Sequence, residues 1–337
     1  MDQKKRNGSQ NSGKVIIFLA FIFLISMSLT VSGHQSDVET IYLEIRNSSP
    51  LYDVQETVVI FQNEGMTLVA TLVTPKGLKN PPIVITLHGF TQDRFHKEIP
   101  NTGGEHFYPR LSRKFAELGI ATLRVDFRGT GDSDGDYTMT TFSTQISDVL
   151  AAVEYVRTNL KYTVNTNSIG LLGIDQGGLV TCAAASQDKR IDAAVLWSSV
   201  VSPAFTYGSM LTLDSIRNGV MLPDGGTLCL PIYVGGIYQG DIELGKGFFQ
   251  EVFTVDPRAS ILDYKGPLMY IAGKVDSLVF PQPIAAQSLL ENHDGEEKLI
   301  LLPGDHEFDS DNGCEQFDDA VYWSAAWFIK TLKIQNK

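Results

Sequence analysis

The chain has 337 residues and a net charge of −12, a length that fits one large α/β domain or two small ones. Residues 1–33 hold four basic side chains and one acid, so the remaining residues carry −15. An acidic body argues against nucleic acid and anionic lipid as partners. Three cysteines are too few for a disulfide scaffold, although Cys229 and Cys314 could pair in an oxidising compartment.

The N-terminal 33 residues differ in kind from the rest. Four basic side chains precede or flank an uncharged apolar run, "VIIFLAFIFLISMSLTV", at residues 15–31. This pattern is typical of a signal peptide, cleaved before His34, or of a retained membrane anchor, since the run approaches the length of a bilayer span. Either alternative predicts that residues 34–337 are extracytoplasmic, secreted or anchored, with membrane contact if the segment is kept.

The first predicted elements are strands. "TIYLEI" (40–45), "TVVIF" (57–61) and "MTLVATLVTP" (66–75) are rich in β-branched residues and predict an antiparallel lead-in. "PIVITLHGF" (82–90) is a continuous apolar run, as expected for a strand buried on both faces of a parallel sheet, and "IATLRVDF" (120–127) is the next expected strand. Between them we expect a helix over 108–118, ended by a glycine C-cap at Gly119.

Helices and strands then alternate toward the C-terminus. Helical spacing covers 142–160, 282–292 and 316–332, and strands are expected at 168–174, 192–200, 267–276 and 298–304. This alternation predicts a mostly parallel central sheet with helices on both faces, in one domain over 34–337. Residues 201–262 break it. They are rich in glycine and aromatic residues and too long for a connecting loop, so we expect a lid inserted over the sheet.

Polar residues follow four of the predicted strands, where the catalytic groups of open α/β sheets gather. One is a turn, "GIDQG", in which Gly173 and Gly177 flank Asp175. A serine at position 175 would make this the G-x-S-x-G nucleophile elbow. Asp276 and His306 follow the last two strands, in the chain order elbow, acid, histidine.

The remaining strand end, "LHGF", supplies backbone donors. Gly89 lets the chain turn so that the N–H of Phe90 can point into the site, together with the N–H of Gln176 from the elbow. Two converging N–H groups make an oxyanion hole. His88 is interpreted as a packed core histidine. The chain has no P-loop, no complete dinucleotide fingerprint and no zinc spacing, so no cofactor or metal is expected.

Five motifs together carry a resemblance: "LHGF", "DFRGTGDSDG", "GIDQGG", "GKVDSLV" and "GDHEF". Over roughly 81–200 and 267–337, the chain resembles the α/β-hydrolase superfamily, and in particular its cinnamoyl and feruloyl esterase-like branch, which is serine aminopeptidase-like. The resemblance implies an α/β-hydrolase fold and a small-molecule ester or acyl substrate. It assigns the oxyanion hole to Phe90 and Gln176, the acid to Asp276 and the base to His306.

The departure from this branch is Asp175 in the serine's place, and it leaves three hypotheses. The first is an ester-cleaving hydrolase whose activity is weakened or altered. The second is an epoxide hydrolase or dehalogenase-like enzyme, because a carboxylate attacks saturated carbon whereas its attack on an acyl carbon gives a mixed anhydride. Tyrosines of the lid, Tyr207, Tyr233 and Tyr238, would then be candidate donors. The third is a non-catalytic protein that retains the pocket and binds a ligand in it.

Overall fold

The computed structural model describes residues 37–332. The predicted leader or anchor, residues 1–33, lies outside these residues and stays a prediction. Within the described part, no helix combines the length and the apolar character needed to cross a membrane. The three cysteines, all in this part, are unpaired, so Cys229 and Cys314 form no disulfide here.

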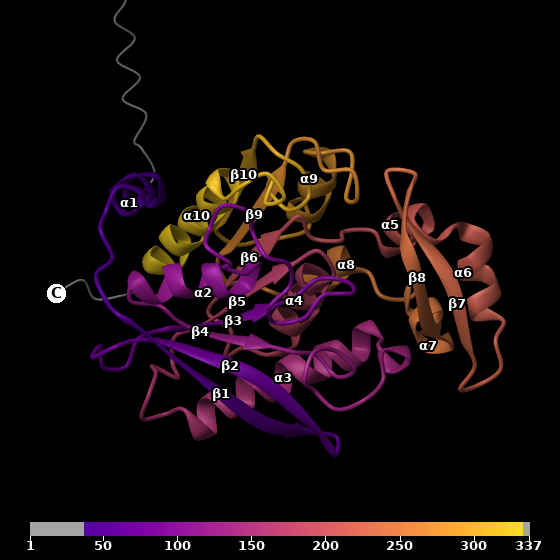
Figure 1. Cartoon of the computed structure of the whole chain (residues 1–337), viewed down its shortest axis with the longest axis horizontal. Helices are drawn as coiled ribbons and strands as arrows, with labels where there is room; N and C mark the ends of the chain where they lie inside the picture. Colours follow the sequence, from indigo (N-terminus) through magenta and orange to yellow (C-terminus); the bar gives the residue numbers. More distant parts are fainter. Residues whose placement is uncertain (1–36, 333–337) are drawn as a thin grey trace, which may run out of the picture. The chain divides into compact units, whose positions relative to one another are not determined.

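A single eight-stranded sheet organises residues 37–332 (Figure 1). Only β2 runs antiparallel to its neighbours, and all other pairings are parallel. The central strands are buried on both faces, which explains why their sequences are continuous apolar runs. In spatial order the strands are β1 (Val54–Asn63), β2 (Met66–Pro75), β4 (Ala121–Val125), β3 (Ile83–Leu87), β5 (Ile169–Ile174), β6 (Ala193–Trp197), β9 (Leu268–Gly273) and β10 (Glu297–Leu302).

Helices cover both faces of this sheet, as the alternation predicted, and each face has its own apolar cluster. One face is covered by α1 (Asp37–Arg46), α2 (Phe107–Glu117) and α10 (Glu315–Thr331). The other is covered by α3 (Phe142–Asn159), α4 (Gln176–Gln187), α8 (Pro257–Ile261) and α9 (Ile284–Leu290). Gly119 follows the end of α2 with φ +88°, the left-handed conformation expected of a glycine at this position.

The strand predicted at 40–45 is wrong, because these residues belong to helix α1. The buried residues of α1 are Val38 and Tyr42, one helical turn apart, which is the spacing of a helix and not of a strand. Tyr42 stacks on Trp323 of α10 with ring centroids 4.1 Å apart, and its hydroxyl donates to Asp319 at 3.0 Å. Packing against α10 therefore decides the conformation of a segment that is rich in strand-forming residues.

Residues 201–262, the predicted lid, connect β6 to β9 and are regular rather than a loop. They contain α5 (Pro203–Leu211), α6 (Leu213–Val220), the antiparallel hairpin β7 (Thr227–Val234) and β8 (Ile237–Gly245), α7 (Lys246–Glu251) and α8. In Figure 1 the hairpin lies beside α5, α6 and α7. The hairpin is mostly half-exposed, so its sequence lacks the clean alternation that would have revealed it. Its action as a lid remains a prediction.

Candidate active site

Asp175 lies at a sharp turn between β5 and α4. Its φ of 53° and ψ of −117° are strained for a non-glycine residue and typical of a nucleophile elbow. The flanking positions must be glycines because a side chain at either would collide with the backbone. A Cβ on Gly173 would lie 2.1 Å from the carbonyl oxygen of Gly177, and one on Gly177 would lie 2.3 Å from that of Leu87. The turn that the sequence predicted is therefore present, with an aspartate at its apex.

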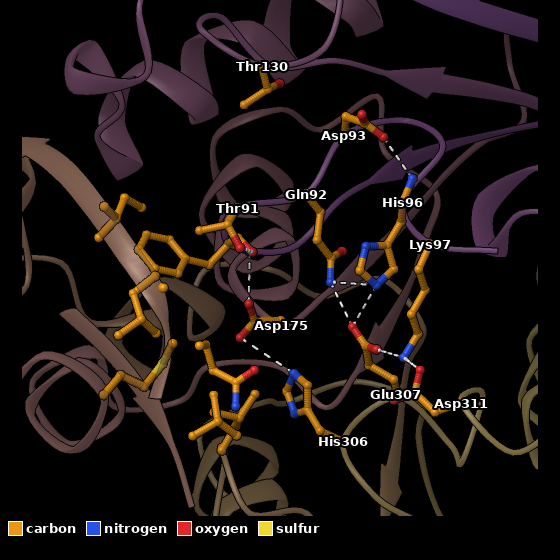
Figure 2. A pocket seen from close by; sticks show the side chains of 18 of the residues that line it. Thr91, Gln92, Asp93, His96, Lys97, Thr130, Asp175, His306, Glu307 and Asp311 are labelled. Atoms are coloured by element: carbon orange, nitrogen blue, oxygen red, sulfur yellow. Dashed lines mark hydrogen bonds and ion pairs between the residues drawn. The ribbon is translucent and has the colours of Figure 1, made fainter. Parts of the chain in front are cut away.

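The predicted acid and histidine meet beside this turn. His306 Nδ1 lies 3.0 Å from both carboxylate oxygens of Asp276. Asp276 is held in turn by the backbone N–H groups of Leu278 and Val279, which donate to its Oδ1 at 2.8 and 2.9 Å. The other ring nitrogen, His306 Nε2, lies 3.8 Å from Asp175 Oδ1. Figure 2 shows His306 facing Asp175.

The predicted oxyanion-hole donors are bonded to Asp175 itself. The N–H of Phe90 donates to Asp175 Oδ2 at 2.9 Å. The N–H of Gln176 also lowers the pKa of this carboxyl group, as a donor to a carboxylate does. All five predicted site residues are thus brought together, but the aspartate occupies the position in which a substrate oxygen would be bound.

Burial and opposite charge together set the protonation of this pair. Burial by itself lowers the pKa of His306, but the carboxylates of Asp276 and Asp175 outweigh it and raise that pKa to about 10. Burial raises the pKa of Asp175, while His306 and the two backbone N–H groups pull it back toward its ordinary value. His306 is therefore the positively charged partner at neutral pH.

Two groups that the sequence left open have structural roles. His88 is buried, its Nε2 lies 3.1 Å from Thr130 Oγ1, and burial lowers its pKa, so it is a packed core histidine as interpreted. Tyr207 is fully buried, and its hydroxyl donates to the side-chain oxygen of Gln176 at 2.5 Å. The Gln176 amide donates to Gln145 at 2.8 Å. Tyr207 therefore joins α5 to the elbow and is not a donor in the cavity.

A cavity of about 870 Å³ opens above these groups. Asp175, His306 and Phe90 line it, together with residues of the β7–β8 hairpin such as Ile232 and Ile242. A volume in this range is typical of small-molecule sites. Among residues 37–332, no group of histidine, cysteine and acidic side chains is arranged to hold a metal ion.

Several side chains that touch this site gave no signal in the sequence. Gln92 and Glu307 lie in loops next to Phe90 and His306, and they bond to each other at 2.9 Å. Tyr137 accepts a hydrogen bond from the N–H of Thr91 at 3.0 Å and lines the cavity. Glu307 belongs to the "GDHEF" motif, but nothing in the sequence connects it with Gln92 or Tyr137, because only the folded chain brings their loops together.

The comparisons with known proteins concern the fold. The family model for X-Pro dipeptidyl-peptidases of the S15 family matches residues 64–219. A structure of Est1E from Butyrivibrio proteoclasticus with ferulic acid bound is 22% identical, with a TM-score of 0.65, covering 82% of this chain and 100% of that one. The esterase domain of a Rhodothermus marinus protein is 20% identical, with a TM-score of 0.59, covering 83% and 98%. The chain has the α/β-hydrolase fold.

Curated relatives match only part of the chain. An uncharacterized 31.7 kDa protein of Escherichia coli, from the traX-finO intergenic region, is 29% identical over 133 residues. The polyketide transferase grgF of a Penicillium species is 32% identical over 147 residues. The matched stretches cover 40% and 43% of this α/β-hydrolase-fold chain, and 42% and 44% of the relatives' own lengths.

Proposed function

We propose that this protein is a hydrolase of small-molecule esters, from the cinnamoyl and feruloyl esterase-like branch, whose turnover Asp175 weakens or alters. One observation carries the proposal: His306 lies between Asp276 and position 175, 3.0 Å from the first carboxylate and 3.8 Å from the second. This is the arrangement in which histidine takes a proton from an elbow nucleophile. The ferulic acid bound to Est1E and the esterase-like neighbours support an ester as the substrate class.

Three physical reasons make ester turnover slow in the chain as it stands. Asp175 Oδ2 accepts the Phe90 N–H that would stabilise the developing oxyanion of an ester. His306 is already protonated at neutral pH and cannot take a further proton. Attack by the Asp175 carboxylate on an acyl carbon would also form a mixed anhydride, which is a high-energy product.

The same geometry favours a second candidate, in which Asp175 attacks a saturated carbon of an epoxide or alkyl halide. One carboxylate oxygen, Oδ2, is held by the Phe90 N–H, while Oδ1 is 3.8 Å from His306 Nε2. Attack by Oδ1 forms an ester bond to the substrate carbon. With an alkyl halide, the carbon–halogen bond breaks and the halide ion leaves. With an epoxide, one carbon–oxygen bond breaks and the oxygen stays on the substrate as an alkoxide, which takes a proton from water. The ester has no negative charge, so the pKa of His306 would fall, and the neutral ring could activate water for hydrolysis.

A substrate panel in heavy-oxygen water separates these candidates. We expect slow turnover of short aryl esters, with no label entering the peptide that contains Asp175. Turnover of an epoxide or alkyl halide, with label in the Asp175 carboxylate, would replace the first candidate with the second. If the panel yields neither reaction but the same compounds bind in the cavity, the protein is a non-catalytic binding protein and both enzyme proposals fail.

We also propose that residues 34–337 act outside the cytoplasm, because residues 1–33 combine a basic start with an apolar run. Fusion of a reporter that is active only outside the cytoplasm, placed after residue 337, tests this proposal. An inactive reporter on a stably expressed fusion would contradict it. Mass spectrometry of the N-terminus then distinguishes cleavage before His34 from a retained anchor.

A further inference from the structure

The loop after β3 and the loop after β10 both line the cavity, and they are joined through Glu307. This residue follows His306 in the loop after β10. Its carboxylate accepts hydrogen bonds from three side chains of the loop after β3: Gln92 at 2.9 Å, His96 at 2.8 Å and Lys97 at 2.5 Å. Figure 2 shows the three side chains converging on Glu307. The histidine loop is therefore docked onto the loop that supplies the Phe90 N–H.

The other end of Gln92 reaches the backbone beside Phe90. Gln92 Oε1 accepts the N–H of Gly89 at 3.0 Å and the hydroxyl of the buried Tyr108 at 2.6 Å. A continuous path thus runs from Glu307 through Gln92 to the amide that precedes Phe90. The residues next to its two ends are His306 and Phe90, the predicted base and the predicted oxyanion donor.

The three amides of this turn have different side-chain acceptors. Gly89 N–H donates to Gln92 and, at 3.2 Å, to the Tyr108 hydroxyl, Phe90 N–H to Asp175, and Thr91 N–H to the Tyr137 hydroxyl. Two of these acceptors reach the histidine loop: Gln92 through its hydrogen bond to Glu307, and Asp175 through its ion pair with His306 at 3.8 Å. Loss of the bridge, the hydrogen bond between Gln92 and Glu307, would leave the Phe90 N–H positioned mainly by its bond to Asp175.

Charge strengthens the bridge at Glu307. Burial by itself raises the pKa of this carboxyl group, but the hydrogen bonds and positive charges of His96 and Lys97 outweigh it and hold the pKa at about 2. Glu307 is therefore ionised at all physiological pH values. An ionised carboxylate accepts shorter and stronger hydrogen bonds than a neutral group, so the docking of the two loops is tight.

We propose that Gln92 and Glu307 are positioning residues that together fix the Phe90 N–H relative to His306. Neither side chain bonds to Asp175, so they act through the backbone of Gly89 and through the neighbouring His306. The role goes beyond the proposed function, because it concerns the donor geometry whether the group bound to Phe90 is a substrate oxygen or the Asp175 carboxylate.

A polarity swap tests the proposal. Gln92→Glu places a carboxylate oxygen against Glu307 and should break the bridge, although its other oxygen still accepts the Gly89 N–H. Adding Glu307→Gln reverses the polarity, because the new amide can donate to the new carboxylate. Gln62→Glu is the matched control. Gln62 is exposed on β1 and is not part of the cavity lining, and its side-chain amide donates to the Thr67 hydroxyl.

The readout is hydrogen exchange at the Phe90 amide, which needs no substrate. We expect Gln92→Glu to speed this exchange about tenfold or more, while the amide of Leu171 in β5 stays protected. The double variant should return to within about threefold of the unaltered protein, and the control should not change. In an Asp175→Ser background, kcat on an aryl ester should follow the same order with KM nearly constant.

Unchanged Phe90 exchange in a folded Gln92→Glu protein would overturn the proposal, and so would a double variant that stays fast at Phe90. If Gln92→Glu unfolds the chain, which would also expose Leu171, the double variant decides alone: restored protection supports the bridge, and unfolding or fast Phe90 exchange contradicts it. Failure of all ester turnover would refute the proposed function and leave the exchange result standing.

Discussion

The Asp175 carboxylate accepts the N–H of Phe90 at 2.9 Å, so the group in the nucleophile position is bonded to the donor expected to hold a substrate oxygen. A serine hydroxyl, one atom shorter in reach than a carboxylate oxygen, would leave this donor free. The carboxylate also places a negative charge 3.8 Å from His306 Nε2. The substitution therefore changes both the donor and the base of the site, without removing either.

The first prediction concerns the protonation of His306. Because Asp276 and Asp175 raise its pKa to about 10, the ring should stay protonated through the neutral range. Asp175→Asn keeps the shape but removes one charge, and should lower the pKa of His306. NMR titration of the ring nitrogens measures both values. A ring that is neutral at pH 7 in the unaltered protein would contradict the electrostatic account.

The same pKa predicts a dependence of stability on pH. A histidine whose pKa is raised by folding stabilises the folded state fully below its ordinary value of about 6.5, and this contribution is lost as the pH rises through about 10. The free energy of unfolding should therefore fall across this alkaline interval. Asp175→Asn should make this decrease in the free energy of unfolding smaller, as measured by urea denaturation at a series of pH values. Equal slopes in the two proteins would show that Asp175 does not contribute.

Gly173→Ala should destabilise the fold by about 3 kcal/mol or more, because the new Cβ would meet a backbone oxygen that cannot move aside. Gly208→Ala is the control: its Cβ would approach only the exposed side chain of Leu213, 2.9 Å from its Cδ2, and that side chain can turn away. Thermal unfolding of both variants provides the comparison. Similar melting temperatures for the two proteins would show that the elbow is less constrained than its contacts imply.

Tyr207→Phe should lower the free energy of unfolding by about 1 kcal/mol, since it leaves the buried side-chain oxygen of Gln176 without its donor. Because the backbone N–H of Gln176 is a proposed oxyanion-hole donor, ester turnover should fall as well. Tyr233→Phe serves as the comparison, because the Tyr233 ring contacts the ring of Tyr238 edge-on in the β7–β8 hairpin. If both changes have the same small effect, the connection between α5 and the elbow is unimportant.

Much of the fold and the site could be predicted because their signals are local. Continuous apolar runs marked the buried strands, and the glycines at 173 and 177 marked the elbow. The chain order of Asp175, Asp276 and His306 was informative because the carboxyl ends of parallel strands meet at one edge of the sheet.

What could not be predicted depends on contacts between distant segments. The conformation of α1 is decided by Trp323 and its neighbours in α10, and the bridge between Gln92 and Glu307 joins loops that are 215 positions apart. The bond from Phe90 to the Asp175 side chain likewise depends on how far a carboxylate reaches across the turn. No pattern within a single segment contains this information.

Hydrolysis of a short aryl ester by Asp175→Ser, compared with the unaltered protein, tests the central claim most directly. The serine frees the Phe90 N–H and removes one of the two carboxylate charges that raise the pKa of His306. Loss of a triad nucleophile typically costs about 10⁴ to 10⁶ in rate. We therefore predict a gain of about 10² or more, abolished when His306→Ala is added. A well-folded Asp175→Ser protein with no gain on any ester, and no effect of His306→Ala, would contradict the account and favour a binding protein.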